Sequence, residues 1–133
     1  MMLRAIAIGA VFACATTAAA ETKILKGPYL QDLAPSSITV MWQVEQAKAA
    51  KLYVNGPGGE RVIAVDPARL AEAKVEGLTP SSRYRYRVEI EGTSWEGEFA
   101  TAPPVGKDVP FSFTVIGDTR YGMAPHRRVI ERM

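Results

Sequence analysis

The sequence predicts a mainly β protein in which an antiparallel β-sandwich is followed by the first βα unit of a truncated α/β domain. Short alternating strands recur from Gly27 to Thr101, and turn residues separate them. An apolar run inside Pro110–Gly122 then ends abruptly in a polar loop. Seven or so short strands within about seventy-five residues are typical of a β-sandwich.

The first twenty residues have the features of an export signal. Arg4 precedes an apolar or small run over 5–15, and three alanines at 18–20 precede Glu21. This pattern predicts a signal peptide (1–20) cleaved after Ala20, and hence a secreted or periplasmic chain. The apolar core is too short to span a bilayer. Lipid anchoring at Cys14 is a minor alternative.

The charge balance narrows the classes of partner. The chain has 16 basic and 14 acidic residues, and removing Arg4 with the leader leaves 15 against 14, a net charge of +1. This near-neutral balance argues against a nucleic acid or an anionic membrane as the partner. The leader also contains the single cysteine, Cys14, so the mature chain has no disulfide to support its fold.

The first predicted strands form one inward face and one hairpin. One set of residues, Ile38, Val40, Trp42 and Val44, alternates with Thr39, Met41 and Gln43, which places Trp42 in the middle of an inward face. Leu52 and Val54 precede a Gly-Pro-Gly-Gly turn at 56–59, and Val62, Ile63 and Val65 follow it. A β-hairpin is the simplest interpretation.

The later strands alternate more regularly. Ala71, Ala73 and Val75 point one way, and the clearest strand then runs over 83–91. Its predicted inner face is Tyr84, Tyr86, Val88 and Ile90, and its outer face is Arg83, Arg85, Arg87, Glu89 and Glu91.

The last strand of the sandwich is expected to pair with this one. Trp95 and Phe99 then point inward, and Glu96 and Glu98 lie across from the arginine row. We interpret the charged row as a solvated sheet face, and an anionic partner is the alternative.

A tyrosine corner specifies the kind of sandwich. Leu78-Thr79-Pro80 followed by Tyr84 is the pattern in which a tyrosine hydroxyl bonds to backbone a few residues upstream. Together with Trp42, it predicts a fibronectin type III-like (immunoglobulin-like) sandwich over 21–102. Pro103, Pro104 and Gly106 indicate a stiff linker over 103–110.

The segment 111–133 is expected to begin a second domain. Phe111, Phe113, Val115 and Ile116 form a β-prone run that Gly117 ends, and a helix is predicted over 125–133. Asp118 directly follows the predicted strand, where ligands bind in open α/β sheets, and its carboxylate is a natural ligand for a divalent metal. A plain strand-ending turn is the alternative.

Several motifs, in this order, resemble the purple acid phosphatases and related calcineurin-like metallophosphoesterases. They are Gly27–Gln31, Ile38–Trp42, LTPSSRYRYRV at 78–88, Phe99–Pro103 and the run FTVIGDTR. The resemblance implies a secreted enzyme that hydrolyses phosphate esters at a two-metal centre of Fe, Zn or Mn. In that family Asp118 would be a metal ligand.

Two residues near Asp118 leave alternatives open. Many members of the family have a histidine ligand at the position of Arg120, and arginine cannot ligate a cation because it stays protonated. Arg120 would instead hold phosphate oxygens or form a structural salt bridge. We expect His126 to be a hydrogen-bonded histidine near a helix start, and a ligand or proton-transfer role is the alternative.

The chain lacks most of the ligands that such a centre needs. A two-metal site requires several Asp, His and Asn side chains, so we expect the 133-residue chain to be an inactive N-terminal fragment. The competing interpretation is a non-enzymatic, exported fibronectin-like module that binds protein or carbohydrate. Such sandwiches have many functions, so the fold alone does not distinguish the two.

Overall fold

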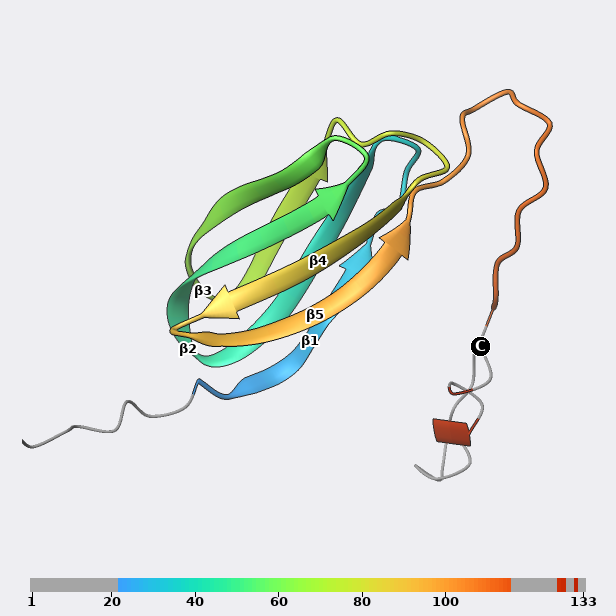
Figure 1. Ribbon diagram of the computed structural model, residues 1–133. Helices are drawn as coiled ribbons and strands as arrows, with labels where there is room; N and C mark the ends of the chain where they lie inside the picture. The colour runs from blue at the N-terminus through green and yellow to red at the C-terminus, as the bar shows by residue number, and fades with distance from the viewer. Residues whose placement is uncertain (1–21, 116–126, 129–130, 132–133) are drawn as a thin grey trace, which may run out of the picture.

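The computed structural model describes residues 22–115, 127–128 and 131. Its regular elements are strands arranged in two facing layers, and the segment after residue 100 leaves at the end of the sandwich opposite the start of the first strand (Figure 1). The strands, in chain order, are β1 (Ile24–Gln31), β2 (Ser37–Gly56), β3 (Gly59–Glu76), β4 (Arg83–Ile90) and β5 (Thr93–Ala100). The predicted mainly β, antiparallel fold is confirmed.

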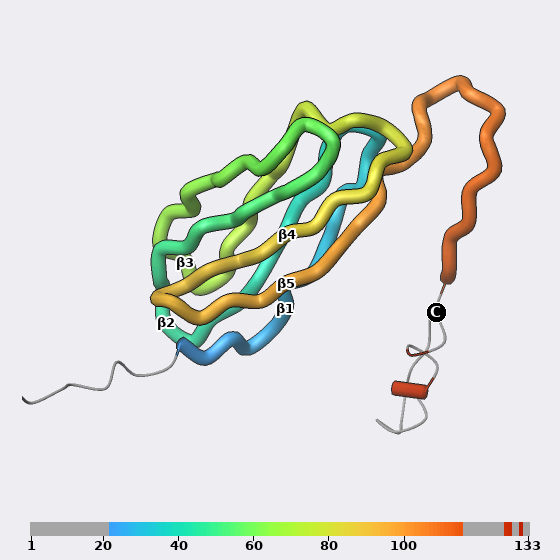
Figure 2. The backbone as a smooth tube through the Cα atoms, viewed as in Figure 1, coloured from blue at the N-terminus to red at the C-terminus, as the bar shows by residue number. Residues whose placement is uncertain are grey.

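The two long strands each contribute to both layers. The first half of β2 pairs with β1 and with the second half of β3, and the second half of β2 pairs with the first half of β3 and with β4. The β2–β3 register breaks between Gln43 and Ala50, and here both strands bend (Figure 2). Each therefore accounts for two of the seven short strands predicted from the sequence.

The layers can be defined by their pairing. Layer 1 contains β1, residues 37–44 of β2 and 70–76 of β3. Layer 2 contains residues 59–65 of β3, 50–56 of β2, β4 and β5. The β2–β3 hairpin predicted over the Gly-Pro-Gly-Gly turn is confirmed, with Gly56 paired to Gly59.

The core lies between the layers and consists mostly of the predicted alternating residues. Trp42, Val40, Leu52 and Val88 have no exposed surface. The remaining core residues are Ile38, Val44, Ala50, Val54, Ala71, Ala73, Val75, Leu78, Tyr84, Tyr86, Ile90 and Phe99. This agreement arises because a strand sends successive side chains to opposite faces, so the period of two identifies the buried set.

The tyrosine corner is present as expected. The Thr79 amide donates a hydrogen bond of 2.8 Å to the Tyr84 hydroxyl. Nearby, the buried Thr101 hydroxyl donates to the Thr79 carbonyl at 2.7 Å and accepts from the Ser82 amide at 3.0 Å. The two side chains therefore hold the loop before β4 against the end of β5.

The predicted βα unit is not seen in the described residues. Residues 111–115 contain no strand, and Phe111, Phe113 and Val115 are 69%, 75% and 82% exposed. A β-prone run becomes a strand only when a neighbouring strand accepts and donates its backbone hydrogen bonds, and no described strand lies beside this one. Of the predicted helix, the structure describes Arg127, Arg128 and Glu131, with one hydrogen bond from the Glu131 amide to the Arg127 carbonyl.

Within the described residues, no helix has the length and apolar character needed to cross a membrane.

Candidate functional site

Asp118, the predicted metal ligand, and Arg120, the candidate phosphate-binding residue, lie outside the described residues, and so does His126. Their predicted roles therefore stay predictions. In the part of the chain that the structure does describe, no three or more His, Cys, Asp or Glu side chains gather in a way that could hold a metal ion. The candidate surfaces in that part belong to the sandwich.

The outer side of layer 2 is a charged sheet face, which we call the arginine–glutamate face. Its rows follow from the registers, which place Arg85 opposite both Asn55 and Glu98, and Arg87 opposite both Tyr53 and Glu96. The face has four basic and four acidic side chains, so its formal charge is balanced. These are Lys51, Arg83, Arg85 and Arg87, and Glu60, Glu89, Glu96 and Glu98.

One cluster orders the centre of this face. The Arg87 guanidinium carbon lies 3.8 Å from the centre of the Tyr53 ring, in a cation–π arrangement. Its Nη1 also donates to Glu89 Oε2 at 2.5 Å. The hydrogen bond with Glu89 is the main reason that the pKa of Arg87 is raised, so this guanidinium stays charged. Two contacts thus hold Arg87 in one position.

Beside this cluster is a shallow groove of about 250 Å³, lined by Tyr53, Asn55, Glu60, Arg85, Arg87 and Glu96 among others. Of the ion pairs in the described part of the chain, none involves Arg85, Glu96 or Glu98. The groove therefore offers a guanidinium, carboxylates and an amide whose polar atoms remain available to a partner.

The sequence predicted only part of this face. The arginine row and the two glutamates opposite it were identified from alternation, and the register confirms their pairing. Tyr53 and Asn55 were missed, although they lie between and beside the inward Leu52 and Val54. The same alternation places them outward, next to the arginines once β2 and β4 are paired.

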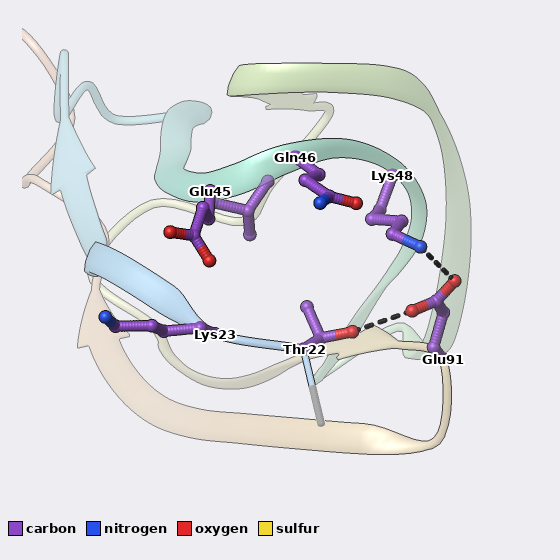
Figure 3. A pocket seen from close by; sticks show the side chains of 7 residues that line it. Thr22, Lys23, Glu45, Gln46, Lys48 and Glu91 are labelled. Atoms are coloured by element: carbon purple, nitrogen blue, oxygen red, sulfur yellow. Dashed lines mark hydrogen bonds and ion pairs between the residues drawn. The ribbon is translucent and has the colours of Figure 1, made fainter. Parts of the chain in front are cut away.

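A second, smaller pocket lies at the end of the sandwich where β1 begins and β4 turns into β5. It measures about 120 Å³. Figure 3 shows Thr22 and Lys48 converging on the Glu91 carboxylate, while the Lys23 amine points away from this pair. The Thr22 hydroxyl and the Lys48 ammonium each donate to Glu91 at 2.8 Å. These groups already satisfy one another. The network therefore has a mainly structural role, because it ties Thr22, just before β1, and Lys48, on β2, to Glu91 in the β4–β5 turn.

This small network makes a contribution to stability that depends on pH. Hydrogen bonds from Lys48 and Thr22 hold the pKa of Glu91 below its ordinary value of 4.5. A lowered folded-state pKa stabilises the fold above 4.5, and this contribution is lost as pH falls through the folded-state pKa. We therefore expect the melting-temperature difference between wild type and Glu91→Gln to be constant above about pH 5.5 and to shrink below 4.5.

The effect is small, because Glu91 is exposed and salt screens the pair. The measurement is a series of thermal melts at low salt, with Glu72→Gln as the control because Glu72 is exposed on layer 1. A Glu91→Gln difference that grows as the solution becomes more acidic would contradict the assignment.

Comparison with solved structures identifies the fold. The fn3 domain of human contactin 1 matches with a TM-score of 0.53 and 18% identity, covering 76% of this chain and 93% of that one. The sensor domain of the anti-sigma factor RsgI4 from Pseudobacteroides cellulosolvens matches with a TM-score of 0.53 and 18% identity, covering 69% and 100%. A fibronectin type III domain of human KIAA0970 matches with a TM-score of 0.50 and 18% identity, covering 74% and 85%.

These matches place the described chain among the fibronectin type III-like β-sandwiches. At 18% identity, they show the fold alone. No family model matches the sequence.

These findings contradict the expectation that the chain is part of a purple acid phosphatase or a related metallophosphoesterase. The three matched structures are fibronectin type III and sensor domains, none of the three is a catalytic domain, and nothing in them supports hydrolase or phosphatase activity. The physical reason lies in the motifs. Trp42 is a core residue and Tyr84 forms the tyrosine corner, so the segments around them specify the sandwich fold, which by itself implies no phosphatase activity.

Proposed function

We propose that the chain is a non-enzymatic, exported β-sandwich module that binds a protein through its arginine–glutamate face. The observation that carries the proposal is the ordered Tyr53–Arg87–Glu89 cluster, which borders a groove of available polar groups on a rigid sheet. Tyrosine and arginine are among the residues that most often contribute strongly to protein interfaces. The signal peptide predicted over 1–20 would bring this face to partners outside the cytoplasm.

The same cluster favours a protein over a carbohydrate. Sugar rings commonly stack on an open aromatic face, but Arg87 already covers one face of the Tyr53 ring. Balanced charge also argues against a polyanion, because four acidic side chains lie among the four basic ones. A protein surface with mixed charges is the partner that complements such a face.

The test is a comparison of two variants with the same change in net charge. Arg85→Glu with Arg87→Glu reverses two charges on the face, and Lys26→Glu with Lys74→Glu reverses two charges on layer 1. Each immobilised chain is exposed to the exported protein fraction of the source cells, and the captured proteins are quantified by mass spectrometry. We expect the face variant to lose a captured protein by about tenfold or more while the control retains it.

Thermal melts and circular dichroism establish that both variants are folded. Capture of the same proteins in equal amounts by wild type and the face variant would overturn the proposal.

A further inference from the structure

The charge pattern of β4 and β5 is complementary to a copy of itself. Outward-facing arginines form a column on β4, and outward-facing glutamates form a column on β5. The register places Arg85 beside Glu98 and Arg87 beside Glu96, so each basic side chain has an acidic neighbour at the same height along the strands. This pairing at equal height is the feature that matters for symmetry.

A twofold axis parallel to these strands, above the boundary between them, stacks β4 of one copy over β5 of the other. Because the paired residues lie at the same height, Arg85 then faces Glu98 of the second copy, and Glu98 faces Arg85 of the second copy. Arg87 and Glu96 make the same reciprocal pair. Sheets that stack face to face keep their strands within about 30° of each other, which this arrangement satisfies.

We infer that the arginine–glutamate face forms a symmetric dimer with a second copy of the chain, along β4 and β5. This inference rests on the proposed function, because it names the partner of the same face. Arg85, Glu96 and Glu98 support this inference, because they take part in none of the ion pairs in the described residues and so remain available to a second copy. Edge-to-edge pairing of β5 is disfavoured because charged side chains protect an exposed edge strand.

The dimer should be weak and sensitive to salt. Ion pairs between exposed side chains contribute little individually, and contacts of low area form transient complexes. We expect the association constant of the full chain, measured by sedimentation equilibrium, to fall about tenfold or more between about 50 mM and 500 mM salt.

A charge-swap experiment tests whether the two charged columns form the contact. The first variant carries Arg85→Glu and Arg87→Glu, so both columns are acidic, and the second carries Glu96→Arg and Glu98→Arg, so both columns are basic. Each variant alone should be monomeric, because every reciprocal contact becomes repulsive. An equimolar mixture should form a heterodimer, because every contact is attractive again.

The apolar segment 111–115 provides an alternative source of self-association, because its phenylalanines are exposed. Association through that segment would persist in both charge variants alone, and this result would overturn the inference. So would a mixture that stays monomeric at low salt.

The results distinguish a failure of self-association from a failure of the proposed protein binding. If the wild type and the mixture are both monomeric, but the wild type captures a protein that the first variant loses, self-association fails and protein binding stands. If the mixture dimerises while no protein is captured, the partner of this face is the second copy alone.

Discussion

Trp42→Ala is expected to lower the free energy of unfolding by about 3–5 kcal/mol. The Trp42 side chain is fully buried and is the largest in the core. It lies opposite Ala71 on β3, where the small neighbour leaves room for the indole. Truncation removes apolar area from the core and leaves a cavity between the two layers.

Trp42→Phe is the informative control. It also removes volume, but it eliminates the indole N–H, which has no hydrogen-bond partner in the described residues. A buried donor without a partner costs about 1–3 kcal/mol, so its removal offsets part of the lost packing. We expect the cost of Trp42→Phe to be less than half that of Trp42→Ala.

Both costs are measured by denaturant unfolding, in variants whose slope of unfolding free energy against denaturant concentration matches that of wild type. A cost below about 1 kcal/mol for Trp42→Ala would contradict the assignment of Trp42 to the core.

Gly56→Ala is expected to cost about 1–3 kcal/mol, although the substitution adds a single methyl group. A β-carbon on Gly56 would overlap the ring of Tyr84, at Cδ1 and Cε1. The ring must move, and its hydroxyl then loses its geometry with the Thr79 amide. The strain therefore reaches the tyrosine corner from the β2–β3 turn.

Gly58→Ala in the same turn is the matched control, because nothing lies within 4 Å of a β-carbon at that position. Its effect should stay within about 0.5 kcal/mol. A double-mutant cycle with Tyr84→Leu isolates the clash, because the ring is then absent. If Gly56→Ala costs the same with and without the ring, the Tyr84 contact is not the cause.

The strand predicted over 111–115 does not form in the tertiary structure. Alternation over 111–115 has the same period as the alternation over 38–44, and both predicted a strand. The run over 111–115 is exposed and unpaired, whereas the run over 38–44 lies between β1 and β3. Local pattern measures how well a segment would fit a sheet, and whether a neighbouring strand is present depends on the rest of the fold.

The arginine–glutamate face was also predicted only in part from the sequence. The sequence alone predicted that Arg83, Arg85 and Arg87 share one side of a strand, because outward and inward residues alternate. It could not show that Arg87 lies over Tyr53, because these residues are far apart in the chain and meet only through the β2–β4 register.

The sequence by itself therefore determined the class of fold, most of the buried set and the tyrosine corner. These follow from a period of two and from contacts between residues close in sequence. The tertiary structure decided that β2 and β3 each bend into both layers, and which charges meet on the arginine–glutamate face. The physical reason is that strand register is a long-range property, set by packing of the whole core and not by any single strand.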